Sequence, residues 1–204
     1  YITDTGNNRI QHLSSSGQVL HAWGSFADSA AGEAPGGTFY EPWGIAVADD
    51  GSVFVADAWN HRIQKFDREG NFITTWGFFG QAETGDALWG PRDIVINDQG
   101  YLLVTDTGNK RIVIYDQDGN FINEFGSAGM LEAQFDEPVG LALSDGGLLF
   151  VADTWNQRIQ VFQDAGDGIN YEYTREWPIV AWYGQSLDNK PYLAVTSDEH
   201  LLVS

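Results

Sequence analysis

The residues of this sequence that could do chemistry together are an aspartate, an asparagine and an arginine, set two or three positions apart. A carboxylate, an amide and a guanidinium at this spacing could form an acid site or an anion clamp. Four such sets occur: Asp4/Asn7/Arg9, Asp57/Asn60/Arg62, Asp106/Asn109/Arg111 and Asp153/Asn156/Arg158. Successive arginines lie 53, 49 and 47 residues apart. An enzyme needs its acid once, whereas a group that returns at a fixed period builds each repeat. We therefore predict a structural role for these residues, in which Asp and Asn accept from N–H groups of their own turn and Arg pairs with a carboxylate, the Asp of its own blade or of a neighbouring blade.

The elements that position these sets are predicted to be short strands. In the period 91–137, apolar residues alternate in 92–98 and 110–116, and a Gly turn precedes the branched residues of 99–106. Asp-Gly-Asn at 118–120 is a hairpin signal, and no window has the spacing of a helix. Four antiparallel strands in each period of this length predict an all-β fold, a β-propeller of four-stranded blades. The predicted repeats are 1–41, 42–90, 91–137 and 138–190, with the start of another at 191–204.

The wording around these sets resembles the NHL repeat, a propeller family. The resemblance rests on the Asp–x–x–Asn–x–Arg phrase, on "EPWGIAVADDG" at 41–51 and "EPVGLALSDGG" at 137–147, and on Phe39 and Phe135 three residues before proline. Within 86–95 the pattern changes, because Leu88 replaces the Phe and Arg92–Asp93 replaces x–Gly. Six blades are usual in this family, so we interpret the four as a segment of a larger ring; a closed four-bladed ring is the alternative.

The amino-acid composition limits the classes of molecule that the chain is expected to bind. Of 204 residues, 29 are Asp or Glu and ten are Lys or Arg, a formal net charge of −19. Such a chain lacks the basic stripe that nucleic acid or an anionic membrane surface requires. There is no cysteine, which excludes disulfides and thiolate metal sites, and no apolar run reaches the length of a membrane span. The chain does not begin with Met, and we interpret it as part of a longer protein.

A second resemblance concerns location. The stretch "WPIVAWYGQSLDNKPYLAV" at 177–195 resembles the last blade of propellers appended to bacterial multi-span membrane proteins. This resemblance implies an extracytoplasmic location at the cell surface or in the periplasm. The parent chain would supply a membrane tether, with no direct membrane contact from this segment.

Ligand-binding residues are expected where the copies differ. Two positions of the turn between the second and third strands vary, reading Gly6, Trp59, Gly108 and Trp155 at the first and Asn8, His61, Lys110 and Gln157 at the second. An exposed Trp is a platform for a sugar ring or an apolar side chain; the alternative is that it covers the Arg stem or the next blade. The candidate ligand-binding residues are Trp59, His61 and Trp155, with Trp182 and Tyr183 from the irregular loop 177–191. Most other loop aromatics, among them Phe78, Phe79 and Trp89, are expected to wedge between blades.

No metal or cofactor is predicted for this segment. His12, His21, His61 and His200 have no local ligand spacing. The sequence "DQDGN" at 116–120 begins like a calcium loop, but Ser127 stands where the loop needs Glu, so we predict a hairpin turn there.

Two function classes remain. The favoured one is a non-catalytic binding or sensor propeller that presents a loop face to a protein or glycan. The alternative is a propeller-type metal-dependent lyase or hydrolase whose site lies in blades outside this sequence, because the axial strands here offer little beyond Asp93 and Asn97. RNA binding, which the resemblance also suggests, conflicts with the net charge.

Overall fold

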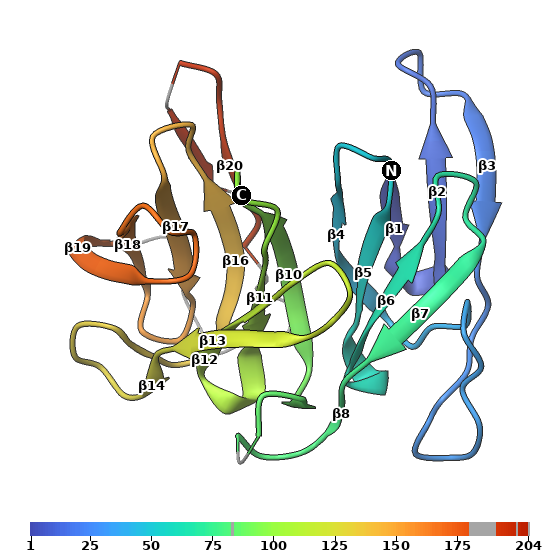
Figure 1. The fold of residues 1–204 in the computed structure, drawn as a ribbon, viewed down its shortest axis with the longest axis horizontal. Coiled ribbons are helices and arrows are strands. Elements are labelled where there is room, and N and C mark those ends of the chain that lie inside the picture. Colours follow the sequence, from blue (N-terminus) through green and yellow to red (C-terminus); the bar gives the residue numbers. More distant parts are fainter. Residues whose placement is uncertain (83, 180–190, 199, 204) are drawn as a thin grey trace. The chain divides into compact units, whose positions relative to one another are not determined.

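The computed structural model describes residues 1–82, 84–179, 191–198 and 200–203. They form two compact units, residues 1–94 and 95–204, and each is described by itself. Figure 1 labels the strands of both. Among the described residues there is no helix long and apolar enough to cross a membrane.

In the first unit, antiparallel strands follow one another in sequence order within each sheet (Figure 1). A three-stranded sheet comprises β1 (Ile2–Asp4), β2 (Arg9–Leu13) and β3 (Val19–Trp23). A four-stranded sheet comprises β4 (Pro42–Val47), β5 (Val53–Asp57), β6 (Arg62–Phe66) and β7 (Phe72–Trp76). The short strands β8 (Phe78–Phe79) and β9 (Ala87–Leu88) pair in parallel within the following loop.

The second unit repeats this plan. One four-stranded sheet, whose first strand spans the boundary between the units, comprises β10 (Pro91–Ile96), β11 (Leu102–Asp106), β12 (Arg111–Tyr115) and β13 (Phe121–Phe125). The next comprises β16 (Pro138–Leu143), β17 (Leu148–Asp153), β18 (Arg158–Asp164) and β19 (Tyr171–Pro178). Two parallel loop strands, β14 (Ser127–Ala128) and β15 (Gln134–Phe135), lie between these sheets in the sequence. The last pair is β20 (Leu193–Val195) with β21 (Leu201–Val203).

The core lies on the middle strands. β5, β11 and β12 are buried along their whole length, whereas the fourth strands β7 and β13 are mostly exposed or half-buried. In the first unit, Phe39 and Phe66 pack with Val53 and Val55 of β5. In the second, Phe135 and Phe162 pack with strands β11, β12 and β17. Rings buried this way contribute about 1.5–3 kcal/mol each relative to exposure. The three four-stranded antiparallel sheets, with buried middle strands and exposed or half-buried fourth strands, confirm the predicted four-stranded repeats.

The four predicted sets lie at equivalent points of successive sheets. In the four-stranded sheets each Asp ends the second strand and each Arg begins the third, so that the two are directly paired, as in Asp57↔Arg62 and Asp106↔Arg111. In the three-stranded sheet, Asp4 ends β1 and pairs with Arg9 at the start of β2. In the first three copies, a one-turn 3₁₀ helix joins the two strands: η1 (Thr5–Asn7), η2 (Ala58–Asn60) and η3 (Thr107–Asn109). The residue after each turn has a positive φ, 52–59° across Asn8, His61, Lys110 and Gln157. Side chains at the two variable turn positions are thereby held on a fixed backbone.

Candidate functional site

The repeated carboxylates are hydrogen-bonding centres of the fold. Asp57 is fully buried. Its Oδ1 accepts from the Tyr40 backbone N–H (2.7 Å), and its Oδ2 accepts from Asn60 Nδ2 (2.9 Å), Arg62 Nε (2.8 Å) and Gln64 Nε2 (3.0 Å). Asp153 has the equivalent set of partners. Burial raises the pKa of both carboxyls, against the lowering effect of these donors. Both carboxylate oxygens of Asp57 and of Asp153 accept hydrogen bonds from the protein itself, so these two residues have a structural role.

This arrangement corrects one detail of the prediction. Asp was expected to accept from N–H groups of its own turn, but its N–H partner comes from the loop before the sheet, 17 residues earlier. Asn also acts as a donor: Nδ2 of Asn7, Asn60, Asn109 and Asn156 binds the carboxylate of its own set. The reason is that the arginine needs a carboxylate facing it across the strand pair, which turns the Asp away from its own turn.

The repeated arginines bind the same loop. Arg62 donates from Nη1 to the Ala34 carbonyl (2.6 Å) and from Nη2 to the Thr38 carbonyl (2.8 Å). Arg158 donates likewise to the carbonyls of Met130, Leu131 and Gln134. In the first copy, Arg9 still pairs with Asp4 at 2.7 Å, but the Arg9 side chain is 44% exposed. The predicted Asp–Arg pair within one set is present in all four copies.

Trp59 is partly exposed and already has partners. Its side chain lies on the turn after β5, and the residue is 37% exposed. Its indole Nε1 donates to Glu41 Oε2 (2.9 Å), and the Arg92 guanidinium lies 5.2 Å from its ring centroid. The same guanidinium lies 5.0 Å from the Trp43 ring. Trp59 therefore covers an arginine while leaving part of its surface in solvent.

Trp155 occupies the matching position in the second unit and is also 37% exposed. Lys110 Nζ lies 5.6 Å from its ring centroid and pairs with Asp136 (2.9 Å) and Glu137. Burial opposes the charged form of Lys110, but the hydrogen bonds that it donates to these two carboxylates, together with their negative charge, outweigh burial and raise its pKa. The surroundings of Trp155 are thus ionic.

His61 is the most constrained of the candidate residues. Its Nδ1 accepts the Gly90 backbone N–H (3.0 Å), and its ring lies 4.7 Å from the Phe79 ring. Burial lowers the pKa of His61, and the positive charge of Arg92 lowers it further. His61 is therefore a neutral ring at pH 7 that links the turn to the next loop. Trp182 and Tyr183 lie outside the described residues.

Loop aromatics extend this region. We call the following six residues of the first unit the aromatic string: Phe26, Tyr40, Trp59, His61, Phe79 and Trp89. Each ring contacts the next, with centroids 4.7–6.5 Å apart. The expectation that Phe78, Phe79 and Trp89 wedge between blades was wrong, because they are 55%, 60% and 40% exposed. The buried place in this loop is taken by Leu88, as Phe39 and Phe135 take it in the other loops.

The assembly of this string was not predicted from the sequence. Phe26 and Tyr40 come from the loop before β4, Trp59 and His61 from the turn after β5, and Phe79 and Trp89 from the loop after β7. Their contact depends on the Asp57 and Arg62 bonds that draw the first loop onto the turn. Aligning the repeats with one another could have indicated this cluster of rings. Phe26 and Phe79 occupy one position of the repeat, and Tyr40 and Trp89 occupy another.

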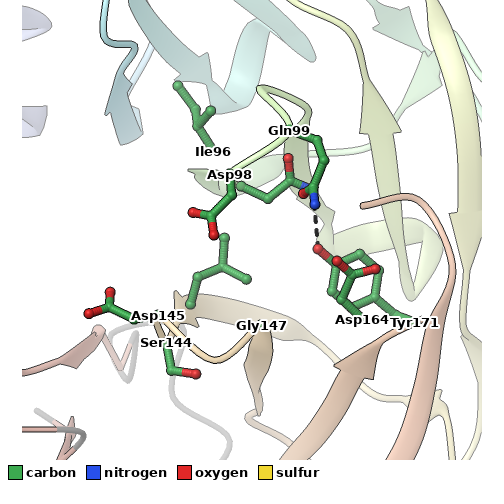
Figure 2. Close-up of a pocket in the computed structure, with 10 residues that line it drawn as sticks. Ile96, Asp98, Gln99, Ser144, Asp145, Gly147, Asp164 and Tyr171 are labelled. Carbon is green, nitrogen blue, oxygen red and sulfur yellow. Dashed lines mark hydrogen bonds between the residues drawn. The ribbon is translucent and has the colours of Figure 1, made fainter. Parts of the chain in front are cut away.

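A separate hollow of about 200 Å³ lies in the second unit, and Trp155 is not among the residues that line it. It is lined by the turns after β10 and β16 and by Asp164 and Tyr171 (Figure 2). Asn97 Nδ2 donates to the Tyr171 hydroxyl (3.2 Å) and to the Gly168 carbonyl (2.7 Å), and Asp164 Oδ1 accepts from the N–H groups of Gly166 and Gly168. Burial raises the pKa of Tyr171. These polar groups are engaged in holding turns together.

Within the described part of the chain, no group of three His, Cys, Asp or Glu side chains is arranged to hold a metal ion. The Asp116 carboxylate accepts from the N–H groups of Asp118 and Asn120 and from Asn120 Nδ2, which confirms the predicted hairpin turn at 116–120.

Comparison with known proteins agrees with this geometry. The NHL repeat family matches residues 39–66, 88–115 and 135–162. Each match runs from the buried loop residue, Phe39, Leu88 or Phe135, to the end of the third strand of the following sheet. The chain contains NHL repeats. The B-box type zinc finger protein ncl-1 of Caenorhabditis elegans is 58% identical over 36 residues, 18% of this chain and 4% of that protein. NHL repeat-containing protein 2 of Gallus gallus is 36% identical over 75 residues, 36% of this chain and 10% of that protein. The chain therefore aligns with a small part of each NHL-repeat relative.

Solved structures resemble the NHL-repeat chain over nearly its whole length. A gluconolactonase from Xanthomonas campestris covers 98% of it and is itself covered to 64%, with a TM-score of 0.65 and 18% identity. An inactive virginiamycin B lyase from Staphylococcus aureus, solved with quinupristin, covers 98% and is itself covered to 64%, with a TM-score of 0.62 and 14% identity. At this identity the likeness shows the fold, a β-propeller, and the predicted fold class is confirmed.

Proposed function

We propose that this NHL-repeat segment is a non-catalytic binding module. It would present the turns between the second and third strands, which carry Trp59 and Trp155, to a protein or glycan. The observation that carries the proposal is the contrast between repeated and variable positions. The repeated Asp, Asn and Arg side chains form hydrogen bonds with one another within the fold. In contrast, Trp59 and Trp155 are partly exposed at positions that differ between copies. Exposed aromatic side chains on a rigid turn lose little conformational freedom when a ligand binds.

Trp59 and His61 are the proposed contacts in the first unit, and Trp155 in the second. Trp182 and Tyr183 remain proposed contributors from the loop 177–191. The net charge of −19 disfavours polyanionic ligands and admits neutral or cationic ones. An extracytoplasmic location, with attachment through the parent protein, is part of this proposal, and protease accessibility on intact cells tests it.

The test of the binding proposal is a peptide and glycan array probed with the wild-type chain and with the double variant Trp59→Ala/Trp155→Ala. Each stacking Trp contributes on the order of 1–2 kcal/mol to binding, so we expect binding at least about tenfold weaker in the double variant. The melting temperature should stay nearly unchanged. If the double variant unfolds, the two Trp side chains are packing residues and the proposal fails. If it folds and binds as the wild type does, the ligand uses another surface, and the loop 177–191 is tested next.

The second candidate is a metal-dependent lyase or hydrolase of propeller type. Its support is that two structural neighbours are named as a gluconolactonase and a virginiamycin B lyase. Its site would lie in blades outside this sequence. The test is an assay of the parent protein for lactone hydrolysis and for lyase activity, with added Mg²⁺ or Ca²⁺ and with a chelator. Chelator-sensitive activity would favour this candidate over the binding module.

A further inference from the structure

The aromatic string differs from its counterpart in the second unit in both shape and charge. We propose that it binds a segment of a partner protein in which Lys or Arg lies next to apolar side chains. This proposal rests on the proposed function and narrows it to one class of ligand.

The rings give the surface its apolar component. Phe26 and Phe79 are each 60% exposed, although each lies against another ring of the string. At the equivalent positions of the loop in the second unit, Ala128 replaces Phe26 and Asp136 replaces Tyr40. Asp136 there pairs with Lys110. The same backbone plan therefore carries exposed rings in one unit and an ion pair in the other.

The polar groups of the string suit a cation better than a sugar. Sugar hydroxyls need hydrogen-bonding groups beside the stacking ring. The indole N–H of Trp59 is already bound to Glu41, and Nδ1 of His61 already accepts from Gly90. These two groups leave ring surface, carboxylate oxygen of Glu41 and the single Nε2–H donor of His61 for a ligand, fewer hydrogen-bonding groups than a sugar ring with several hydroxyls needs.

Charge points the same way. Glu41 lies at the edge of the Trp59 ring, and the Asp28 carboxylate raises the pKa of His61, although less than the Arg92 charge lowers it. Arg92 lies over the Trp59 ring, so a ligand cation is expected at the exposed Phe26 and Phe79 rings and at the carboxylates. Residues 1–94 contain twelve Asp or Glu and five Lys or Arg. Arg62, one of these five, is bound to Asp57 and to loop carbonyls. A Lys or Arg side chain gains from both features, because its head is attracted to carboxylates and ring faces and its stem packs on apolar surface.

The experiment selects peptides from a phage-displayed library of random 12-residue sequences on the full chain, and then measures the selected synthetic peptides by fluorescence anisotropy. We expect the selected sequences to be enriched in Lys or Arg beside apolar residues. The key variant is Phe79→Ala, which leaves the charge unchanged and alters a mostly exposed side chain. It should weaken binding by about two- to fivefold, as should Glu41→Gln. The matched control is Phe121→Ala, which removes a 41% exposed ring outside the aromatic string and outside the proposed contacts, and it should bind as the wild type does.

The outcomes separate this inference from the proposed function. If the selected peptides depend on Phe79 but carry no excess of Lys or Arg, or if Gln in place of their Lys and Arg leaves affinity unchanged, the ligand class is wrong and the binding face stands. The same holds if an arrayed neutral glycan, and no peptide, depends on Phe79. If no peptide or glycan depends on Phe79 or Trp59, both proposals fail for this surface. Circular dichroism melts of each variant confirm that it is folded.

Discussion

At the scale of single residues, the repeated aspartate links three separate segments. Asp57 joins the end of β5 to the start of β6 through Arg62, and to the preceding loop through the Tyr40 N–H. One carboxylate thus fixes a strand, a turn and a loop that is distant in sequence. Its burial is tolerable because a charged donor and neutral donors surround it.

Loss of one such carboxylate should destabilise the fold. In Asp106→Ala, Arg111 and Asn109 lose a buried partner, although Arg111 keeps its pair with Glu124. We expect the free energy of unfolding to fall by about 1–3 kcal/mol, measured by urea denaturation. Asp4→Ala is the matched control, because the Asp4–Arg9 pair is partly exposed, and its effect should be clearly smaller. Equal losses in the two variants would contradict this account.

His61 should make stability depend on pH. Burial lowers its pKa below the ordinary value of 6.5, so the unfolded chain takes up a proton at a higher pH than the native chain does. The stability that His61 contributes is therefore complete above pH 6.5 and is lost as the pH falls from there towards the native pKa. Protonation at Nδ1 would also break the bond from Gly90.

The measurement is urea unfolding at about pH 7.5 and pH 5.5 for the wild type and for His61→Gln. Gln is suitable because Gln157 holds the same positive-φ position in the second unit. We expect the wild type to lose more stability between the two pH values than the variant. Identical losses would show that His61 titrates alike in the folded and unfolded chains.

At this scale, the sequence predicted the structural role of the four sets but not all their partners. Spacing placed Asp57 at the end of one strand and Arg62 at the start of the next, but it left open whether the arginine pairs with the Asp of its own blade or of a neighbouring one. It could not identify the Tyr40 N–H, since that partner is fixed by the path of a loop with no regular pattern.

At the scale of elements, alternation of apolar residues predicted the strands of each sheet. It missed the parallel pairs β8–β9 and β14–β15, which have only two residues per strand and so no period to detect. It also placed Phe78 and Phe79 inside, because large apolar residues are usually buried. In this loop Leu88 fills the core position, and the two phenylalanines are left outside.

The glycine that follows the fourth strand β13 should be essential to the loop between β13 and β16. Gly126 has a φ of +96°, and a Cβ there would lie 2.4 Å from the fully buried ring of Phe135. We expect Gly126→Ala to lower the free energy of unfolding by about 2–4 kcal/mol, from backbone strain and overpacking together. Gly6→Ala is the control, because no atom lies within 4 Å of its added Cβ, and its effect should stay within about 0.5 kcal/mol. Chemical denaturation compares the two, and a similar small effect of both would refute the steric argument.

At the scale of the whole molecule, charge is the dominant property. With 29 acidic and ten basic side chains, the chain repels itself when it is compact. Composition alone predicted this feature, and with it the expectation that polyanionic partners are disfavoured. The number of blades in the ring stays a prediction, because it depends on how successive sheets associate and not on the residues of any one sheet.

Salt should therefore stabilise the folded chain. Screening shortens the reach of charge repulsion from about 30 Å at 0.01 M salt to about 8 Å at 0.15 M. We expect the melting temperature, followed by circular dichroism, to rise by several degrees over this range. Choline chloride in place of sodium chloride should give the same rise, which would assign the effect to screening. A rise confined to one cation would instead indicate binding of that ion.

The turn after each second strand has a consequence for evolution. Asn8, His61, Lys110 and Gln157 share almost one backbone conformation, with φ between 52° and 59°, although their side chains differ in size, charge and polarity. The neighbouring position accepts both Gly and Trp, as in Gly6 and Trp59. For the proposed binding module, single substitutions at these two turn positions would therefore change what a ligand meets while the backbone is inherited unchanged. A lineage of such propellers can acquire new ligands without passing through a misfolded ancestor.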